Sequence, residues 1–328
     1  MTISEIARLA GVSNAAVSRY LNGGSLSAEK REKIRQVVQQ HSYVPNAHAQ
    51  MMRTKRNNLV GVIVPKLDTE SMPAIVDGVS RQLGEAGYTC ILANTDNNVD
   101  KELEYLERFA AGSSLAGVIF CATVLTTEHR KRMSALGVPL VVVGQEIAEH
   151  SCVYFDDQSA ARSMAAILLE RCRGPLGYLG VTDQDRAAGA ARRQGVLDAL
   201  AQSGRGPECL VEERADFTVE SGWEAARRLL GRSPQVDSIF CATDLIAVGA
   251  MKYLREIGKA VPDEVQVTGI GGGTMADIVT PRLTTARYYY QAAGREAARL
   301  LLGAFLDWEQ PVKNLRLGYE VIRRETTR

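Results

Sequence analysis

Four residues near the N-terminus have side chains suited to contacting the bases of double-stranded DNA. Asn14 carries an amide that pairs with adenine, Arg19 carries a guanidinium that pairs with guanine, and the Ala15 methyl can pack on the methyl group of thymine. Ser18 is the fourth residue expected on the same exposed face. Each good pair contributes roughly 1 to 3 kcal/mol of discrimination against a wrong base, so this group could read a sequence.

A second group of polar, charged and aromatic residues follows apolar, strand-like runs in the rest of the chain. Ligands of parallel α/β sheets bind beyond the carboxyl ends of the strands. The segments 65–69, 144–146, 182–193, 216–217, 243–244 and 269–274 are therefore expected to line one cleft. The candidate ligand contacts in them are Lys66, Asp68, Arg186, Arg192, Phe217, Thr243, Asp244 and Gly271.

Short helices must present the N-terminal group. Thr2 and Glu5 have the spacing of a capping box and predict a helix over residues 3–9, which Gly11 ends. Ser13 can cap a second helix running to about residue 22, and a third begins at Ser27. Helix, glycine turn and helix form the arrangement that places the second helix in the DNA major groove. The alternative is a solvated face of a small three-helix bundle.

The charge of the chain is divided between its two ends. Residues 1–56 hold nine Lys or Arg and three Asp or Glu, a net charge of +6, whereas the other 272 residues carry −5. The near-neutral total of +1 therefore conceals a basic head on an acidic body. A basic head is what binding to DNA phosphates requires.

From residue 59 onward, short apolar runs alternate with amphipathic helical patterns. The alternation predicts an α/β fold with doubly wound parallel sheets covered by helices on both faces. Eight main strands are too many for one such unit, so we expect two subdomains, near 59–158 and 159–286, with SCVYFDD passing between them and the C-terminal segment crossing back. The predicted strands are LVGVIVP, YTCILAN, GVIFCA, PLVVVG, LGYLGV, CLVEE, SIFCA and VQVTGIG. This is the architecture of periplasmic sugar-binding proteins.

Several classes of protein are disfavoured. No apolar run reaches about 18 residues and the first residues lack a signal-peptide pattern, so we expect a cytoplasmic protein without a membrane span. The six cysteines include no CxxC pair and are expected to be free thiols. P-loop, GxSxG and HExxH motifs are absent, and the four histidines pair with no nucleophile, so we expect neither an enzyme nor a metal or other cofactor.

At this point three segments in order resemble one known family. TISEIARLAGVSNAAVSRYLNGG, SAEKREKI and YVPNAHAQMMR are similar to the headpiece of the lactose-repressor and galactose-repressor (LacI/GalR) family of bacterial transcription regulators, and the similarity continues to about residue 325. The resemblance implies a helix-turn-helix headpiece over residues 1–45, a hinge helix and linker over 46–58, and an effector-binding and dimerisation domain over 59–328. It also implies that Asn14, Ala15 and Arg19 read bases.

The resemblance assigns a second DNA contact to the hinge, residues 46–53. In that family the hinge folds only on operator DNA and inserts its penultimate apolar residue, usually Leu, into the minor groove. Here that residue is Met52, and the segment begins at Asn46 and ends at Arg53. Met52 is unbranched and apolar and can still unstack a base step, while Arg53 supplies positive charge near the phosphates. A plain polar linker over 46–58 is the alternative.

In the body, the resemblance gives individual residues roles in effector binding. Arg192 matches the arginine that grips the effector, Phe217 an aromatic wall, and Asp244 a cleft carboxylate of the family pattern. The chain departs from sugar- and purine-binding relatives at Gly271, which replaces an Asp. Lys66 matches a basic position of the trehalose-repressor branch, and Arg186 a contact of purine-binding relatives. Two or three cations facing a glycine-rich loop suit a phosphate, so the expected effector is a trehalose or sucrose phosphate, with a neutral disaccharide as the alternative.

The sequence thus predicts a transcriptional repressor of sugar-utilisation genes. We expect a homodimer on a pseudo-palindromic operator, released by a disaccharide or its phosphate. A neighbouring trio, Tyr288, Tyr289 and Tyr290, is expected to pack at a strand edge rather than to bind a ligand. The competing hypothesis is a sugar-binding or sugar-modifying protein without operator-specific DNA binding.

Overall fold

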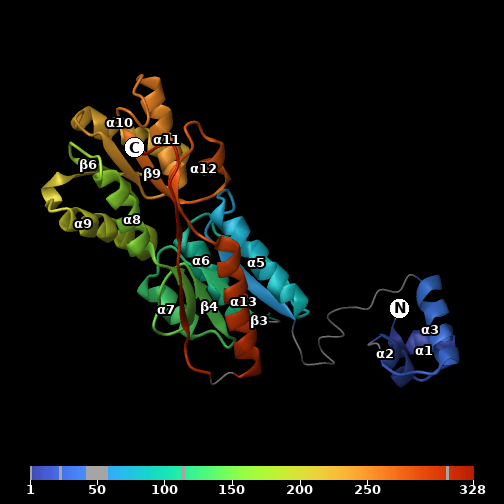
Figure 1. Cartoon of the computed structure of the whole chain (residues 1–328). Helices are drawn as coiled ribbons and strands as arrows, with labels where there is room; N and C mark the ends of the chain where they lie inside the picture. The colour runs from blue at the N-terminus through green and yellow to red at the C-terminus, as the bar shows by residue number, and fades with distance from the viewer. Residues whose placement is uncertain (1, 22–23, 42–57, 112–114, 308–309) are drawn as a thin grey trace. The chain divides into compact units, whose positions relative to one another are not determined.

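The chain forms two compact units, Met1–Asn57 and Asn58–Arg328 (Figure 1). The computed structural model describes residues 2–21, 24–41, 58–111, 115–307 and 310–328. Each unit has its own apolar core, and each is described here by itself.

The described residues of the first unit form three helices, α1 (Ile3–Ala10), α2 (Asn14–Leu21) and α3 (Ala28–Gln40). The predicted capping box is present, because the Thr2 amide donates to Glu5 Oε2 at 2.7 Å and the Glu5 amide donates to Thr2 Oγ1 at 3.3 Å. Gly11 ends α1 with a φ of +63°, a left-handed conformation that glycine adopts without strain. The core of the unit consists of Ile6, Ala7, Ala10, Ala16, Val17 and Ile34. Ser27 occupies the N-cap position of α3, but its side chain makes no capping hydrogen bond.

The second unit is built on two six-stranded sheets. The first sheet has the order β11-β5-β4-β3-β1-β2, and all of its pairs are parallel. Its strands are β1 (Leu59–Val64), β2 (Thr89–Asn94), β3 (Leu115–Cys121), β4 (Leu140–Val143), β5 (Ser151–Phe155) and β11 (Asn314–Leu317). Because β1, β3 and β4 are covered on both faces, their sequences are almost continuously apolar.

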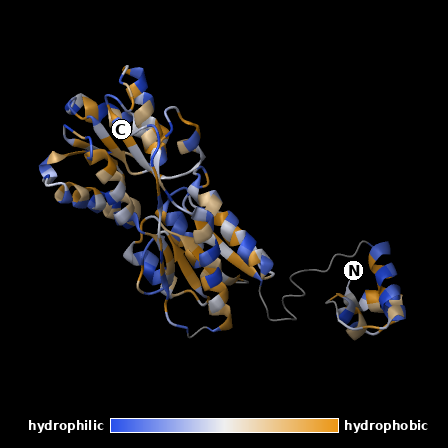
Figure 2. Cartoon of the chain, viewed as in Figure 1, coloured by the Kyte–Doolittle hydropathy of each residue, from blue (hydrophilic) through white to orange (hydrophobic). Residues whose placement is uncertain are grey.

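The second sheet has the order β12-β10-β9-β8-β6-β7, with one antiparallel pair, β10 with β12. Its strands are β6 (Leu176–Gly180), β7 (Leu210–Arg214), β8 (Ser238–Cys241), β9 (Gln266–Gly271), β10 (Thr284–Arg287) and β12 (Glu320–Ile322). Figure 2 shows the hydrophobic colour concentrated on the strands in the middle of this unit. The doubly wound α/β architecture is therefore confirmed.

Helices cover both sheets. The first sheet carries α5 (Ser71–Glu85), α6 (Val99–Ala111), α7 (Thr127–Ser134) and α13 (Tyr290–Leu306), of which α13 packs on α5, β3, β4 and β5. The second carries α8 (Asp157–Leu169), α9 (Arg192–Gln202), α10 (Val219–Arg232), α11 (Asp244–Glu256) and α12 (Thr274–Ile278). Two shorter helices are a π-helix, η1 (Arg186–Ala191), and a 3-10 helix, η2 (Pro207–Cys209).

Three segments connect the two halves of the second unit. The chain leaves the first half after β5, returns to it between β10 and α13, and leaves again between β11 and β12. The expected return of the C-terminal segment is therefore present. SCVYFDD, predicted as a connection, also forms the strand β5, and the sequence analysis missed β10, β11 and β12 as well. Those three strands have three or four residues each, too few for an alternation to be recognised.

Candidate functional site

The predicted base-reading residues lie on one helix, α2. Ala16 and Val17 are buried in the core of the first unit, which turns Asn14, Ala15 and Arg19 to solvent and leaves Ser18 half-buried. The Asn14 amide nitrogen lies 3.3 Å from the Ser4 hydroxyl, near the start of α1. Three side chains suited to base edges are therefore available on the exposed face of α2. Of the predicted hinge contacts, Asn46, Met52 and Arg53 lie outside the described residues.

The second unit contains a cavity of about 190 Å³ between its two halves. It is lined at or just beyond the carboxyl ends of strands in both sheets, where ligands of such folds bind. Six of the predicted contacts line it, namely Lys66, Arg192, Phe217, Thr243, Asp244 and Gly271. Asp68 and Arg186 do not line it, so the expectation that all eight lie in one cavity is corrected. Arg186 lines a neighbouring pocket together with Arg130 and Arg316, because it begins the π-helix and its side chain is exposed.

Arg192 forms a buried ion pair at the cavity wall. Its guanidinium donates to Asp157 Oδ1 at 2.7 Å and also to the carbonyl oxygen of Ala242. The Tyr288 hydroxyl donates to the same carboxylate oxygen at 2.9 Å, and the guanidinium lies over the Tyr288 ring. Burial alone would lower the pKa of Arg192, but the Asp157 carboxylate outweighs it and the pKa is raised. The second carboxylate oxygen, Asp157 Oδ2, makes no hydrogen bond within the described part of the chain.

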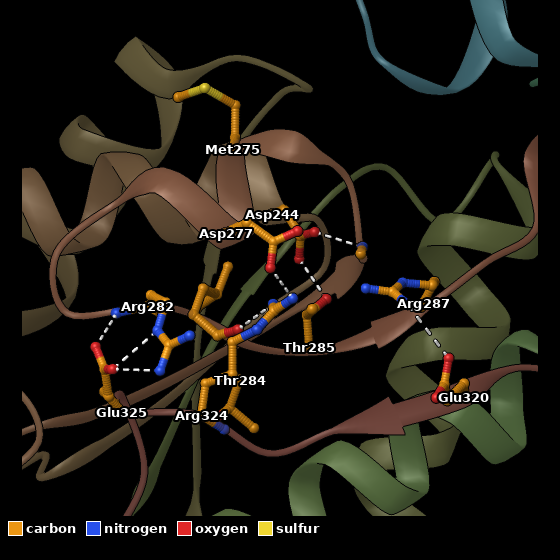
Figure 3. A network of polar contacts seen from close by, with 12 residues as sticks. Asp244, Met275, Asp277, Arg282, Thr284, Thr285, Arg287, Glu320, Arg324 and Glu325 are labelled. Atoms are coloured by element: carbon orange, nitrogen blue, oxygen red, sulfur yellow. Dashed lines mark hydrogen bonds and ion pairs between the residues drawn. The ribbon is translucent and has the colours of Figure 1, made fainter.

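Asp244, the first residue of α11, holds the glycine-rich loop at the end of β9. Its Oδ2 accepts the Gly272 amide at 2.6 Å and its Oδ1 accepts the Thr285 hydroxyl at 2.6 Å (Figure 3). A side chain at Gly271 would collide with this carboxylate, because a Cβ there would lie 2.9 Å from Asp244 Oδ2. Burial raises the pKa of Asp244 to about 6, although these hydrogen bonds oppose the shift. Asp244 therefore fixes the loop, and it carries a proton in part near neutral pH.

Asp185 and Gln145 form a contact across the cavity that the sequence analysis did not identify. The Gln145 amide donates to Asp185 Oδ1 at 2.9 Å and to the Thr123 carbonyl at 2.8 Å. Asp185 Oδ1 also accepts the amides of Ala187 and Ala188, which caps η1. Burial raises the pKa of Asp185. The sequence signal was only positional, because Gln145 and Asp185 lie in the segments 144–146 and 182–193 that were expected to line the cleft.

Aromatic rings form a large part of the wall. Tyr288 stacks on Phe155 with ring centroids 4.3 Å apart, and Tyr290 packs edge-on against both rings. Phe155, Phe217, Tyr288 and Tyr290 all line the cavity. The expectation that the tyrosines pack at a strand edge without facing a ligand site is therefore wrong for Tyr288 and Tyr290, because the chain crosses between the halves there. Tyr289 is exposed.

The charges of the lining are mostly negative. Four carboxylates, Glu70, Asp157, Asp185 and Asp244, face two cations, Lys66 and Arg192. Arg192 is already paired, and Lys66 makes no hydrogen bond or ion pair with a described residue. Carboxylate oxygens, a guanidinium and aromatic faces are groups that bind sugar hydroxyls and the apolar faces of sugar rings.

A helix-turn-helix unit followed by a two-sheet body with a cavity between its halves defines a class of ligand-responsive DNA-binding regulators. The family models agree with this description: residues 2–46 match "Bacterial regulatory proteins, lacI family" and residues 165–327 match "Periplasmic binding protein-like domain". The chain is 31% identical to the sucrose operon repressor of Staphylococcus xylosus, covering 90% of this chain and 91% of that one. It is 32% identical to the transcriptional regulator CelR of Thermobifida fusca, covering 92% and 91% of the two chains.

Solved structures have the same fold. A transcriptional regulator CelR–cellobiose complex matches with a TM-score of 0.77 at 28% identity, covering 99% of both chains. The lac repressor dimer bound to operator and an anti-inducer matches with a TM-score of 0.90 at 22% identity, covering 100% of this chain and 99% of that one, which shows the fold alone. The chain belongs to the lacI family of bacterial regulatory proteins, and it is a helix-turn-helix transcription regulator. Within the described ranges, no helix is long and apolar enough to cross a membrane.

Proposed function

We propose that this protein is a cytoplasmic, non-enzymatic transcriptional repressor whose affinity for an operator is controlled by a sugar bound in the cavity of the second unit. The observation that carries the proposal is the pairing of an exposed base-reading face on α2 with a separate cavity lined by carboxylates, Arg192 and aromatic rings. The names of the similar proteins support it, since they include a sucrose operon repressor and a regulator in complex with cellobiose.

For DNA, we propose that Asn14, Ala15 and Arg19 contact bases in the major groove and that Ser18 supports them. Two copies would bind a pseudo-palindromic operator, which doubles the base contacts of one small unit. The hinge contacts of Asn46, Met52 and Arg53 remain a prediction. Selection of bound sequences from a random duplex library would test the proposal, and recovery of no two-fold symmetric consensus would contradict it.

For the effector, we propose a neutral sugar in preference to a sugar phosphate. Arg192 is already paired with Asp157 and Arg186 lies outside the cavity, so the lining offers a phosphate the single cation Lys66 beside three further carboxyl groups, Glu70, Asp185 and Asp244. Anions of like charge repel strongly in a site of reduced dielectric constant. The cavity volume of about 190 Å³ is also below the ~300 Å³ of the smallest typical ligand sites, which favours a small sugar without an added phosphate group.

Calorimetry with the full-length protein distinguishes the two effector classes. Sucrose, cellobiose, trehalose and ribose would be titrated beside sucrose 6-phosphate and trehalose 6-phosphate. We expect a neutral sugar to bind at least tenfold more tightly than its phosphate. Tighter binding of the phosphate would restore the phosphate prediction, and binding of no sugar would contradict the proposed effector class.

We further propose a homodimer. Strand β2 lies at an edge of the first sheet, and its Ile91 and Leu92 are each 41% exposed. Exposed apolar side chains on an unpaired strand edge favour association with a second copy. Sedimentation equilibrium should give twice the monomer mass, and Ile91→Glu should shift the protein towards monomer. A monomeric wild type at micromolar concentration would contradict this proposal.

A further inference from the structure

Among the described residues, two hydrogen bonds cross the cleft between the halves of the second unit away from the connecting segments. One joins Gln145 to Asp185, and the other joins Glu70 to the backbone of Met275. Gln145 and Asp185 are each only 4% exposed and have further partners, so that contact is fixed. The Glu70 contact is different, because the side chain is exposed and has a single hydrogen bond.

The Glu70 side chain makes its hydrogen bond to the opposite half of the second unit and not to its own helix, α5. It occupies the N-cap position of α5 but makes no capping hydrogen bond there, and the Met72 amide of that first turn donates to Thr69 Oγ1 at 3.3 Å. Its Oε1 accepts the Met275 amide at 3.2 Å, in the first turn of α12, where amides have no partner within the helix. The Glu70 carboxylate thus accepts a hydrogen bond from α12, a helix of the opposite half.

Gly273 makes room for this contact. A Cβ at Gly273 would lie 1.9 Å from Glu70 Oε2, a distance that no pair of unbonded atoms tolerates. The carboxylate therefore rests directly on the backbone of residue 273. Any side chain at this position would push Glu70 away from Met275.

The helix that Glu70 contacts, α12, is held by several polar contacts of its own half. Asp277 of α12 pairs with Arg324, which also donates to the Leu283 carbonyl at 2.9 Å. Arg282 pairs with Glu325 at 2.8 Å (Figure 3), and Asp244 accepts the amide of Gly272, two residues before α12 begins. These contacts tie α12 to the C-terminal strand region, whereas the Glu70 side chain is held only through the Met275 amide among the described residues.

Glu70 also stands between the cavity and an outer pocket. It lines the cavity and a neighbouring pocket of about 340 Å³, to which Thr274, Tyr289 and Arg295 contribute. Gly271, Gly273, Tyr288 and Tyr290 line both spaces as well. The weaker of the two cross-cleft contacts therefore lies at the boundary between the cavity and the surface.

We propose that Glu70 is a latch that closes this side of the cavity through the Met275 amide, and that ligands enter between Glu70 and α12. The identity of the ligand rests on the proposed function, but the existence of the latch does not depend on it. Glu70 then has a positioning role in the binding site, because it holds the two halves together. The residues that line the cavity are thereby brought around the ligand.

The first test is hydrogen exchange of the full-length protein without any added sugar. In Glu70→Ala and Glu70→Asp, the Met275 amide should exchange about two- to tenfold faster, the factor that one hydrogen bond of ordinary strength supplies. Glu70→Gln retains an acceptor at the same reach and should stay near wild type. Gly273→Ala should behave as Glu70→Ala. Glu85→Ala, which changes an exposed glutamate at the other end of α5, is the matched control.

The second test is hydroxyl-radical labelling of the cavity side chain Met72. We expect two- to fivefold more labelling of Met72 in Glu70→Ala than in wild type or Glu85→Ala. Unchanged exchange of Met275 in Glu70→Ala would overturn the latch, and faster exchange without more labelling of Met72 would overturn its role in ligand access. Neither measurement uses a sugar, so failure of the calorimetry leaves both results interpretable.

Discussion

At the scale of single residues, the buried ion pair in the cavity wall contrasts with a neighbouring ion pair that is partly exposed. The guanidinium of Arg192 and the carboxylate of Asp157 are both almost fully buried, and each depends on the other for compensation. Removing one partner of such a pair leaves an isolated buried charge, which is far more costly than removing a pair at the surface. The neighbouring Arg193 provides the comparison, because it pairs with Glu212 in a partly exposed setting.

Arg192→Ala is expected to lower the free energy of unfolding by about 3 to 5 kcal/mol, since it leaves Asp157 buried and uncompensated. Arg193→Ala should cost no more than about 1 kcal/mol. Urea unfolding followed by circular dichroism measures both. Equal losses of unfolding free energy in the two variants would show that the buried ion pair matters no more for stability than the partly exposed one.

Asp244 is expected to make stability depend on pH. Its pKa is about 6 in the folded protein, against 3.8 for an unperturbed aspartate side chain. The folded state therefore binds the proton more strongly, so the stabilisation is fully present below about pH 4 and is lost as the pH rises through 6. The loss amounts to at most about 3 kcal/mol, at 1.36 kcal/mol for each pKa unit.

Asp244→Asn removes this titration. The free energy of unfolding of the variant should fall less than that of wild type between pH 4 and pH 7, whereas the exposed control Asp263→Asn should follow wild type. If the free energy of unfolding depended on pH in the same way for wild type and Asp244→Asn, the assignment of this pH dependence to Asp244 would be contradicted.

At the scale of the elements, α2 separates the residues that hold the first unit together from those that face outward. Ala16 and Val17 pack in the core of the unit, while Arg19 is exposed. Substitutions of the exposed residues can therefore be interpreted as effects on binding rather than on folding.

Arg19→Ala should reduce affinity for the selected operator by roughly 1 to 3 kcal/mol, the value of one good base contact, and affinity for random DNA by much less. Fluorescence anisotropy at fixed salt concentration measures both affinities. Arg35→Ala on α3, where Arg35 pairs with Glu32, is the control and should have a small and uniform effect. An equal loss for operator and random DNA in Arg19→Ala would show that Arg19 reads no base.

At the scale of the whole molecule, the body consists of two halves joined by three connections with a cavity between them. A ligand that closes the halves changes the position of one half against the other, and such domain closure is a common source of allosteric coupling. Coupling of this kind is reciprocal by linkage and typically amounts to 1–3 kcal/mol.

Saturating effector should weaken operator binding by about 5- to 150-fold, and operator should weaken effector binding by the same factor. Anisotropy with and without effector, together with calorimetry with and without operator, gives both numbers. Strengthened binding would identify a corepressor, and no change in either quantity would remove the allosteric interpretation.

The amino-acid sequence was sufficient for those features that depend on neighbours along the chain. The capping box of Thr2 and Glu5, the glycine that ends α1, and the buried strands β1, β3 and β4 are local patterns of hydrogen bonding and apolar periodicity. These local patterns also indicated where the strands end, and hence which segments line the cavity. A resemblance to a family supplied the roles of individual residues within those segments.

Only the tertiary structure decided which side chains meet. Asp157 and Arg192 are 35 positions apart, Asp157 and Tyr288 are 131, and Glu70 and Met275 are 205. Periodicity reports that a position is buried or exposed but not which distant residue lies against it, because the partner depends on how three crossing segments close the halves on each other. That closure brought Tyr288 and Tyr290 into the cavity wall and left Arg186 outside it.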